Sequence, residues 1–292
     1  MSAMTPLVAV IPPVVREPHA VGANCMIRQF SHTDFAGAMS PLVLADHFVM
    51  TGPTFELHPH AGMSAVTVLF ENSRGTMSSH DSVHNNHHIE PGDLHWTLAG
   101  RGIVHTQRPE GNNTRLDGLQ LFVNLPAKLK RIAPRTLLLR SVDVPLIQTP
   151  GVRLRLLVGN LEGRQSPLSV PQSILIVDGT LSNKAETSIP LQAGWNLWLY
   201  ARRGELAIKV AGECNDVTLS HGEATAIATM RETKVTIQCI DHESAFVVIA
   251  GPAINEPVVQ LGPFVMTSQE EAQQAFADYR AGKFGAVLPF AR

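Results

Sequence analysis

Residues 58–70 read HPHAGMSAVTVLF and contain the pattern on which the fold assignment depends. His58 and His60 stand two positions apart, Gly62 marks a turn, and a largely apolar run with several β-branched residues follows. Alternate residues of a β-strand point to the same face, so both imidazoles would project together and could converge on one metal ion. We therefore expect a strand, a glycine turn and a second strand, with a metal site on the first.

A similar arrangement recurs about 130 residues further along the chain. Gln192-Ala193-Gly194-Trp195 resembles His60-Ala61-Gly62-Met63, and His221-Gly222-Glu223 resembles Pro91-Gly92-Asp93. The similarity is weak residue by residue, but its offset along the chain is consistent. Such self-similarity indicates two copies of one structural unit.

Short runs of β-branched or aromatic residues, separated by Gly, Pro, Asn or Asp, make up most of the remaining chain. Many short strands without helices between them favour β-sandwiches or β-barrels. The clearest predicted strands are Thr67–Phe70, Gln120–Val123, Ile174–Val177, Lys234–Ile237 and Phe246–Ile249.

The predicted fold is all-β, with two antiparallel β-barrel domains and a short C-terminal helix. Prolines interrupt the strand pattern in residues 131–153, so we place the domains at 1–135 and 136–292. The helix is expected over Glu270–Ala281, because Ser268 and Glu271 have capping-box spacing and Gly282 follows the run.

Composition restricts the classes of function. The 292 residues are 44% hydrophobic and 16% charged, which suffices for a sizeable core and excludes a disordered chain. The formal net charge is -2, and Lys and Arg are scattered along the sequence. Because nucleic-acid binding usually requires a basic face, direct binding to DNA or RNA is not expected.

Cysteine usage and hydropathy indicate a cytoplasmic protein. Three cysteines at wide spacing fit buried thiols in a reducing compartment. The apolar residues 6–15 are interrupted by two prolines and follow no basic residue, unlike a signal peptide. No uninterrupted apolar run approaches the ~20 residues that a membrane span requires.

Eight of the 13 histidines lie between residues 58 and 105. His105 and Gln107 repeat the spacing of His58 and His60, so two neighbouring strands could offer three imidazoles and an amide oxygen to one divalent ion. The alternative is that His58 and His60 are exposed strand residues and His105 satisfies a hydrogen bond in the core. Nitrogen and oxygen ligands suit Fe, Mn, Ni, Co, Cu or Zn, so the ligand types do not identify the metal.

The chain resembles the pirin family of the cupin superfamily from about residue 20 to residue 285. The motifs that carry this resemblance begin before the histidines and continue almost to the C-terminus. They are Pro41–Phe48, His58–Gly62, Val66–Phe70, His80–Ser82, Ile89–Asp93, Ala99–His105, Gly118–Lys128, Ile249–Pro252, Glu256–Val258 and Gly262–Met266.

The resemblance implies a bicupin with one metal, iron(II), held by three histidines and a glutamate. By position the histidines are His58, His60 and His105, and the glutamate position is occupied by Gln107. Some pirins resemble quercetin 2,3-dioxygenases and open a flavonol ring with O₂, which implies a small aromatic or enolic substrate. Others act as redox-dependent regulatory proteins, which implies a protein partner instead.

Gln107 changes the charge of such a site. With a carboxylate the ligands leave a divalent ion at net +1, whereas an amide leaves it at +2, so metal affinity should fall. An amide also cannot take a proton from a substrate hydroxyl as a general base would. Glu56 could substitute as a carboxylate if its strand extends that far, or it could lie at the rim or hydrogen-bond to a metal ligand.

Other residues have weaker functional interpretations. His95 is expected either at the mouth of the pocket or packed in the core. Arg101, between two glycines, is expected to bind an anionic ligand or to pair with a carboxylate. Four further histidines are expected in a solvated polar loop: His80, His84, His87 and His88.

The internal repeat predicts that the second domain binds no metal. On the offsets above, His58 and His60 correspond to Pro190 and Gln192, while the second pair corresponds to the positions Val235 and Ile237. These side chains cannot assemble a metal site, so we expect a structural role for the C-terminal domain.

Overall fold

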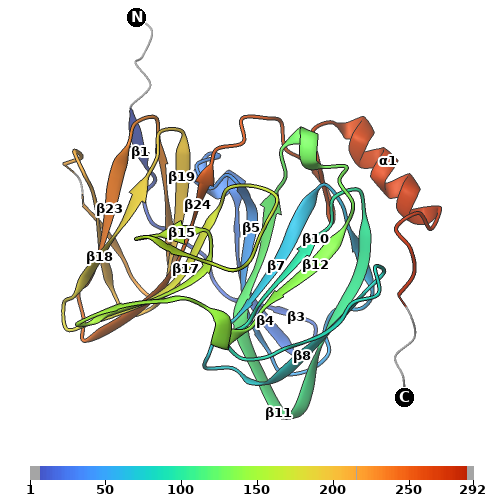
Figure 1. The fold of residues 1–292 in the computed structure, drawn as a ribbon, viewed down its shortest axis with the longest axis horizontal. Helices are drawn as coiled ribbons and strands as arrows, with labels where there is room; N and C mark the ends of the chain where they lie inside the picture. The colour runs from blue at the N-terminus through green and yellow to red at the C-terminus, as the bar shows by residue number, and fades with distance from the viewer. Residues whose placement is uncertain (1–6, 215, 288–292) are drawn as a thin grey trace, which may run out of the picture. The chain divides into compact units, whose positions relative to one another are not determined.

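The computed structural model describes residues 7–214 and 216–287, and it is built mostly of β-strands (Figure 1). Its contacts divide the chain into two compact units, each described here by itself. Unit 1 contains the described residues of Met1–Glu17, Ser31–Pro41 and Val144–Ala253. Unit 2 contains the described residues of Pro18–Phe30, Leu42–Asp143 and Ile254–Arg292. The division into cupin domains at residue 135 stays a prediction.

Unit 2 contains the histidine-rich segment and is organised around one long strand, β11. Its 10-stranded sheet has the order β12-β10-β7-β11-β5-β4-β3, with β6 and β8 also paired to β11 and β9 paired to β8. Its elements are β3 (His19–Val21), β4 (Cys25–Ser31), β5 (Leu42–Met50), β6 (His58–His60), β7 (Met63–Leu69), β8 (Arg74–Asp81), β9 (Asn86–Ile89), β10 (Leu94–Leu98), β11 (Ile103–Asn124), η2 (Ala127–Leu129), β12 (Arg135–Leu139), η3 (Ser141–Asp143), β25 (Val259–Leu261), β26 (Phe264–Met266) and α1 (Gln269–Arg280).

Unit 1 contains an 8-stranded sheet of order β1-β22-β19-β24-β17-β14-β13, with β2 on β22, and a 4-stranded sheet of order β18-β23-β20-β21. Its elements are β1 (Val8–Val10), β2 (Val14–Val15), η1 (His32–Phe35), β13 (Leu146–Thr149), β14 (Val152–Val158), β15 (Asn160–Leu161), β16 (Arg164–Gln165), β17 (Leu175–Ser182), β18 (Glu186–Leu191), β19 (Trp195–Arg203), β20 (Leu206–Val210), β21 (Val217–Leu219), β22 (Glu223–Thr229), β23 (Thr233–Cys239) and β24 (Glu243–Pro252).

The prediction of a mostly β protein with a C-terminal helix is confirmed. Its strands pair antiparallel, as in β7 with β10 and β19 with β24, and Ser268 caps α1 by accepting a hydrogen bond from the backbone N–H of Glu271 at 3.2 Å. Gly282 follows the helix with φ of 73°, which is the left-handed conformation expected at a helix end. Closed barrels are not confirmed, because the sheets of the described residues end in unpaired edge strands.

The internal repeat is visible in equivalent hydrogen bonds of the two units. Gly92 donates to the carbonyl of Leu69 at 2.9 Å, and Gly222 donates to the carbonyl of Ala201 at 2.7 Å. Both glycines have positive φ, at 88° and 85°. In each unit the strand that accepts this hydrogen bond pairs antiparallel with the strand that follows the glycine, β7 with β10 and β19 with β22.

The register of the repeat differs by one residue from the sequence alignment. In unit 2, His58 pairs with His105, and in unit 1, Ile189 pairs with Val235. The counterpart of His58 is therefore Ile189, and not Pro190 as the sequence predicted. The turn before Gly194 is one residue longer than the turn before Gly62, and this extra residue shifts the strand.

The corrected register leaves unit 1 with a purely hydrocarbon surface at the positions of the histidines. His60 corresponds to Leu191 rather than Gln192, and the other positions are Ile189, Val235 and Ile237. All four apolar side chains are buried in one hydrophobic cluster. None of them has an atom that can bind a metal. This is the physical reason for predicting a structural role for this part of the chain, which stays a prediction.

The structure also bears on the predictions for the cysteines and for membrane spans. Cys25 and Cys239 are buried as expected, whereas Cys214 is exposed, and none of the three forms a disulfide. The described helices include none that is long and apolar enough to cross a membrane.

The C-terminal segment of the chain belongs to unit 2, where it supports the turn after His60. Ala61 forms a parallel β-bridge to Phe264, and its carbonyl accepts a hydrogen bond from the N–H of Val265 at 3.0 Å. The buried ammonium of Lys130 donates to the carbonyls of Gly62 and Val265, each at 2.9 Å. These contacts tie the turn to residues about 200 positions away in the sequence.

Gly62→Ala should destabilise the protein far more than Gly194→Ala. Both glycines have positive φ, which costs an alanine about 1–2 kcal/mol. At Gly194 no atom lies within 4 Å of an added Cβ, whereas at Gly62 the Cβ would clash with the carbonyl oxygen of Val265. We expect a loss of about 3 kcal/mol or more for Gly62→Ala. Urea unfolding of both variants measures this difference, and equal losses would contradict the packing described here.

Asp117 joins three parts of unit 2 through its carboxylate. It accepts hydrogen bonds from His47 Nε2 at 2.9 Å, Asn72 Nδ2 at 3.0 Å and Arg115 Nη1 at 3.2 Å. Burial alone would raise the pKa of Asp117, but these partners outweigh it and lower the pKa to about 2.

This pKa predicts a pH-dependent contribution to stability. The folded-state pKa lies below the unfolded value of about 3.9, so the stabilisation is present above about pH 4 and is lost as the pH falls towards 2. It amounts to about 2 kcal/mol. In Asp117→Asn, stability near neutral pH should fall and its dependence on pH between about 4 and 2 should flatten. Urea unfolding at several pH values tests this, and an unchanged acid dependence would contradict it.

Candidate metal centre

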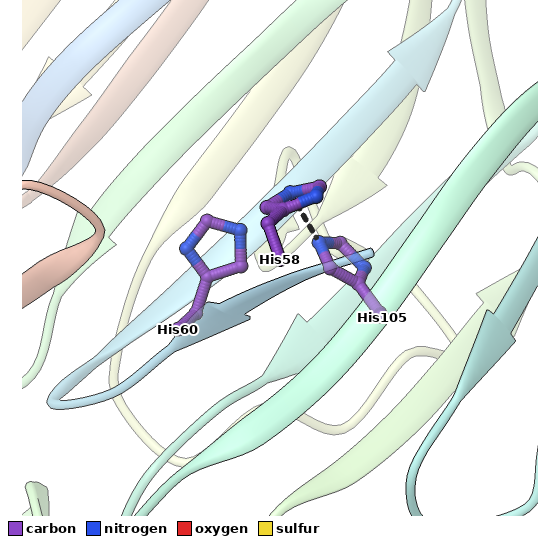
Figure 2. Close-up of side chains that lie close together, drawn as sticks. All are labelled: His58, His60 and His105. Atoms are coloured by element: carbon purple, nitrogen blue, oxygen red, sulfur yellow. Dashed lines mark hydrogen bonds between the residues drawn. The ribbon is translucent and has the colours of Figure 1, made fainter. Parts of the chain in front are cut away.

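Three histidines of unit 2 converge on one point (Figure 2). His58 and His60 lie on β6 and project to the same side, and His105 lies opposite His58 on β11. The prediction that these residues come together is thus met by the strand geometry. Their role as metal ligands is a separate question, which depends on distances and charge.

The distances between the imidazoles suit a single ion. His58 Nε2 and His105 Nε2 lie 3.1 Å apart, and the donor atoms of all three histidines lie within 4.8 Å of one another. Two nitrogens that bind one ion at about 2.0–2.1 Å are separated by about 2.8–3.4 Å for bond angles from octahedral to tetrahedral. The pair His58–His105 is therefore already spaced like two ligands of one metal.

The protonation state of the cluster also suits a cation. Burial, reinforced by the neighbouring imidazoles, lowers the pKa of His60 to about 3 and that of His105 well below its ordinary value. Burial likewise lowers the pKa of His58. All three rings are neutral near pH 7, so they present lone pairs and not positive charges to an ion.

Hydrogen bonding leaves ligand atoms free. His58 Nδ1 donates to the carbonyl of Glu56 at 2.7 Å, which directs the lone pair of Nε2 towards His105. His105 Nδ1 is buried and has no hydrogen-bond partner among the described residues. An ion held by His105 Nε2 would not contact this atom, so the fit depends on the donor set, which is three neutral imidazoles whose nitrogens lie within 4.8 Å of one another. The residues present therefore fit a metal.

Gln107, two residues beyond His105 on β11, is held from two neighbouring strands. Its Oε1 accepts a hydrogen bond from Thr67 Oγ1 at 3.1 Å, and its Nε2 lies 3.4 Å from His95 Nδ1. The side chain also lines the cavity described below. These contacts place the amide beside the histidine cluster, and its coordination to a metal stays a prediction.

His95 is a packed residue and does not line the cavity. It is 1% exposed on β10, where its Nε2 lies 3.2 Å from Nδ1 of the half-buried His87. Burial, together with the nearby His87, lowers the pKa of His95 to about 3, so its ring is neutral. The second of the two sequence interpretations, packing in the core, describes this residue, and its contact with Gln107 adds a link to the site.

Glu56 and Arg101 are both exposed, and neither lines the cavity. Glu56 contacts the cluster through its backbone carbonyl and not through its carboxylate. Arg101 lies in the turn between β10 and β11, where its N–H donates to the carbonyl of Ile132 at 3.0 Å. Neither anion binding nor carboxylate pairing by Arg101 is shown.

The prediction of one polar loop for the four remaining histidines is wrong for three of them. His80 lies on β8, and His87 and His88 lie on the paired strand β9, so that only His84 occupies the turn, with φ of 68°. The segment contains few β-branched residues, and its strands are stabilised by pairing with β11 rather than by local propensity.

A cavity of about 270 Å³ lies over the cluster. Phe55, which is 40% exposed, is part of its lining, so the cavity reaches the surface. Met63 and Phe70, on and directly after β7, are fully buried and do not line it. Its apolar lining consists of Ile27, Phe48, Met50, Phe55, Met77 and Phe122, and its polar lining of Asp46, His58, His60, His105, Gln107 and Gln120, with Gly262 and Pro263 completing it.

Sequence reasoning missed Asp46, which is the only carboxylate among these lining residues. It lies on β5, where Gln29 Nε2 donates to its Oδ1 at 2.9 Å. Burial raises the pKa of Asp46 to about 6, against the opposing effect of the hydrogen bond from Gln29. The available signal was a single acidic residue within the apolar run 42–50.

Comparison with protein-family models matches residues 14–123 to Pirin and residues 176–285 to the Pirin C-terminal cupin domain. The chain is 34% identical to Pirin of Mus musculus over 277 residues, which cover 93% of this chain and 92% of the mouse protein. This chain belongs to the pirin family. It is also 34% identical over 253 residues to a Pirin-like protein of Solanum lycopersicum, covering 85% and 82% of the two chains.

Solved structures show that the fold is shared. A quercetin 2,3-dioxygenase from Acinetobacter baumannii aligns with a TM-score of 0.82 at 24% identity, covering 96% of this chain and 98% of that one. The bacterial pirin YhhW from Escherichia coli, in complex with nickel(II), aligns with a TM-score of 0.63 at 20% identity and covers 85% and 100%. The pirin-type cupin architecture expected from the sequence is thus present.

The geometry predicts that this pirin binds one divalent ion per chain through the three histidines. Elemental analysis of tag-free protein purified without chelator should find about one equivalent of metal. His58→Ala should lose most of it, because two imidazoles bind far less tightly than three. His88→Ala, which removes an exposed histidine from the neighbouring hairpin, is the control and should leave the metal content unchanged. Equal metal in the wild type and in His58→Ala would exclude this cluster as the site.

Proposed function

We propose that this pirin is a metal-dependent oxygenase that acts on a compact aromatic or enolic substrate. The observation that supports this function best is the cavity, in which three neutral imidazoles lie below a largely apolar wall. A binding site for a small planar molecule has this composition, with a few converging polar groups in an apolar pocket.

His58, His60 and His105 would hold the ion, with Gln107 as a weak fourth ligand or as a hydrogen-bonding neighbour. The family resemblance implies iron(II), and nickel(II) is the ion in the related Escherichia coli structure. A divalent ion there would bind oxygen atoms of the substrate and promote their ionisation at its open positions. The apolar side chains around it exclude water from the bound substrate.

The cavity volume restricts the substrate. About 270 Å³ is at the lower limit for pockets that enclose drug-sized ligands. The walls therefore favour a molecule of one or two rings, with hydroxyl or carbonyl oxygens directed at the histidines. A larger flavonol would have to leave part of its structure outside, near the exposed Phe55.

Oxygen uptake tests this function. Iron(II)-loaded protein should consume O₂ with flavonol, catechol or cyclic enol substrates, and the smaller ones should be preferred. His58→Ala should abolish the uptake and His88→Ala should retain it. A metal-loaded protein that binds none of these compounds and consumes no O₂ would contradict an oxygenase function.

Gln107→Glu examines the departure from the family pattern. A carboxylate would lower the net charge of the occupied site from +2 to +1, so metal should be retained longer against a chelator and turnover should rise. The new side chain can still accept the hydrogen bond from Thr67. If neither metal retention nor rate changes, Gln107 is not a metal ligand.

A regulatory role is the second candidate, and the rim of the cavity supports it. Phe55 and Leu57 are 40% and 50% exposed and flank the exposed Glu56 directly before the first metal-site histidine. Exposed apolar residues beside a metal site could report its occupancy to a protein partner. A partner captured only by the metal-loaded form, without turnover, would favour this role over catalysis.

A further inference from the structure

We propose that Asp46 is the proton acceptor for a hydroxyl group of the substrate, so that the acid–base group of the site comes from β5 and not from the glutamate position on β11. This inference rests on the proposed function, because it concerns a substrate bound in the same cavity. Asp46 belongs to neither the histidine cluster nor the strands that carry it.

Strand register places Asp46 on the face of the sheet that borders the site. Asp46 pairs with Gln120, Gln120 pairs with Thr67, and Thr67 pairs with His95, so the four residues form one row across β5, β11, β7 and β10. Directly paired residues of neighbouring strands point to the same face.

Hydrogen bonds connect this row to the metal centre. Thr67 Oγ1 lies 2.9 Å from Gln120 Oε1 and 3.1 Å from Gln107 Oε1. Asp46, Gln120 and Gln107 all line the cavity together with the histidines. A substrate bound over the histidines would therefore lie beside the amide of Gln107 and beside the carboxylate of Asp46.

The other candidates for a proton acceptor are less suitable. Gln107 is an amide without basic character near neutral pH. The lone pairs of the three histidines would be committed to the ion, and His95 lies outside the cavity lining. Glu56 is exposed and also lies outside that lining. Asp46 is thus the one ionisable oxygen acid among the lining residues.

The surroundings of Asp46 suit proton exchange. Burial raises its pKa to about 6, while Gln29 and the more distant charge of His19 on β3 favour the carboxylate form. Cys25 on β4 has its pKa raised to about 11 by burial and by Asp46, so it stays neutral. A base whose pKa lies near the working pH accepts and returns a proton efficiently.

The step itself is a simple proton transfer. The substrate O–H bond breaks, its electron pair stays on the substrate oxygen, and an O–H bond forms on Asp46. Gln29, the hydrogen-bond partner of Asp46, is exposed, so the proton can leave to solvent past this side chain. No oxidant is required for this step, which precedes any reaction with O₂. The substrate class is accordingly a phenol or enol whose hydroxyl group ionises on binding.

Proton release on ligand binding tests the role of Asp46 without turnover. The protein is loaded with zinc(II), which has no redox chemistry, and titrated calorimetrically with catechol in buffers of different ionisation enthalpy. The pH is set near 7, which lies above the pKa of about 6 of Asp46, so that its carboxylate can accept a proton. This pH is well below the ordinary phenol pKa of about 10, so that the free probe is protonated. The absorption spectrum of the bound probe reports its ionisation.

In the wild type, the bound probe should be ionised with clearly less than one proton released per probe, because Asp46 takes the proton and the neighbouring oxyanion of the probe raises the pKa of this carboxyl further. In Asp46→Asn, which keeps an oxygen for Gln29, about one proton per bound probe should appear in the buffer. Asp46→Glu should restore the wild-type value. Glu110→Gln removes an exposed carboxylate on β11 outside the cavity lining and should behave like the wild type.

The outcomes separate this inference from the function on which it rests. If the zinc-loaded wild type binds no probe, the proposed function fails. If it binds the ionised probe but the wild type and Asp46→Asn release equal numbers of protons, only the assignment of Asp46 is overturned. Zinc content near one equivalent confirms that each variant is folded. If Asp46→Asn does not fold, Gln29→Leu is tested instead. In this variant, proton uptake should be lost at a higher pH than in the wild type. The absence of such a shift would also overturn the assignment.

Discussion

The pairing of β6 with β11 is the constraint on which the site depends. It sets His58 opposite His105 and, through the alternation of the strand, brings His60 to the same side. A shift of one residue would turn all of these side chains to the other face. The turn at Gly62, held by Lys130 and by the C-terminal segment, maintains this register. The geometry of the site therefore depends on a turn that residues distant in the sequence hold in place.

The two units show how one β-framework can serve two purposes. Equivalent turns and strand pairs recur in both, yet the positions of the histidines in unit 2 are Ile, Leu and Val in unit 1. In unit 1 these side chains complete a large hydrophobic cluster, so that unit derives stability from its interior. In unit 2 the corresponding space contains neutral imidazoles and amides, whose burial is tolerated because hydrogen bonds, and in our proposal a metal, satisfy them.

Much of the arrangement was predictable from local patterns. The spacing of His58 and His60 predicted that both imidazoles share one face, because strand alternation is a local property. The capped helix after Ser268 was predictable for the same reason. The convergence of His105 on them was inferred from its matching spacing to Gln107 and from the family resemblance, since the pairing of β6 with β11 joins distant residues. Features that depend on contacts between residues distant in the sequence were not predictable in this way. The hairpin of β8 and β9 forms against β11, the register in unit 1 depends on one extra turn residue, and Asp46 joins the cavity only through the order of strands in the sheet.

An anomalous difference map at the absorption edge of the bound metal would test the central claim most directly. Our account predicts one strong peak per chain, with imidazole nitrogens of His58, His60 and His105 at about 2.0–2.2 Å from it. Asp46 should lie across the cavity and outside the coordination sphere. A peak held instead by the exposed histidines of β8 and β9, or a metal-loaded crystal without a peak between the three histidines, would contradict the account.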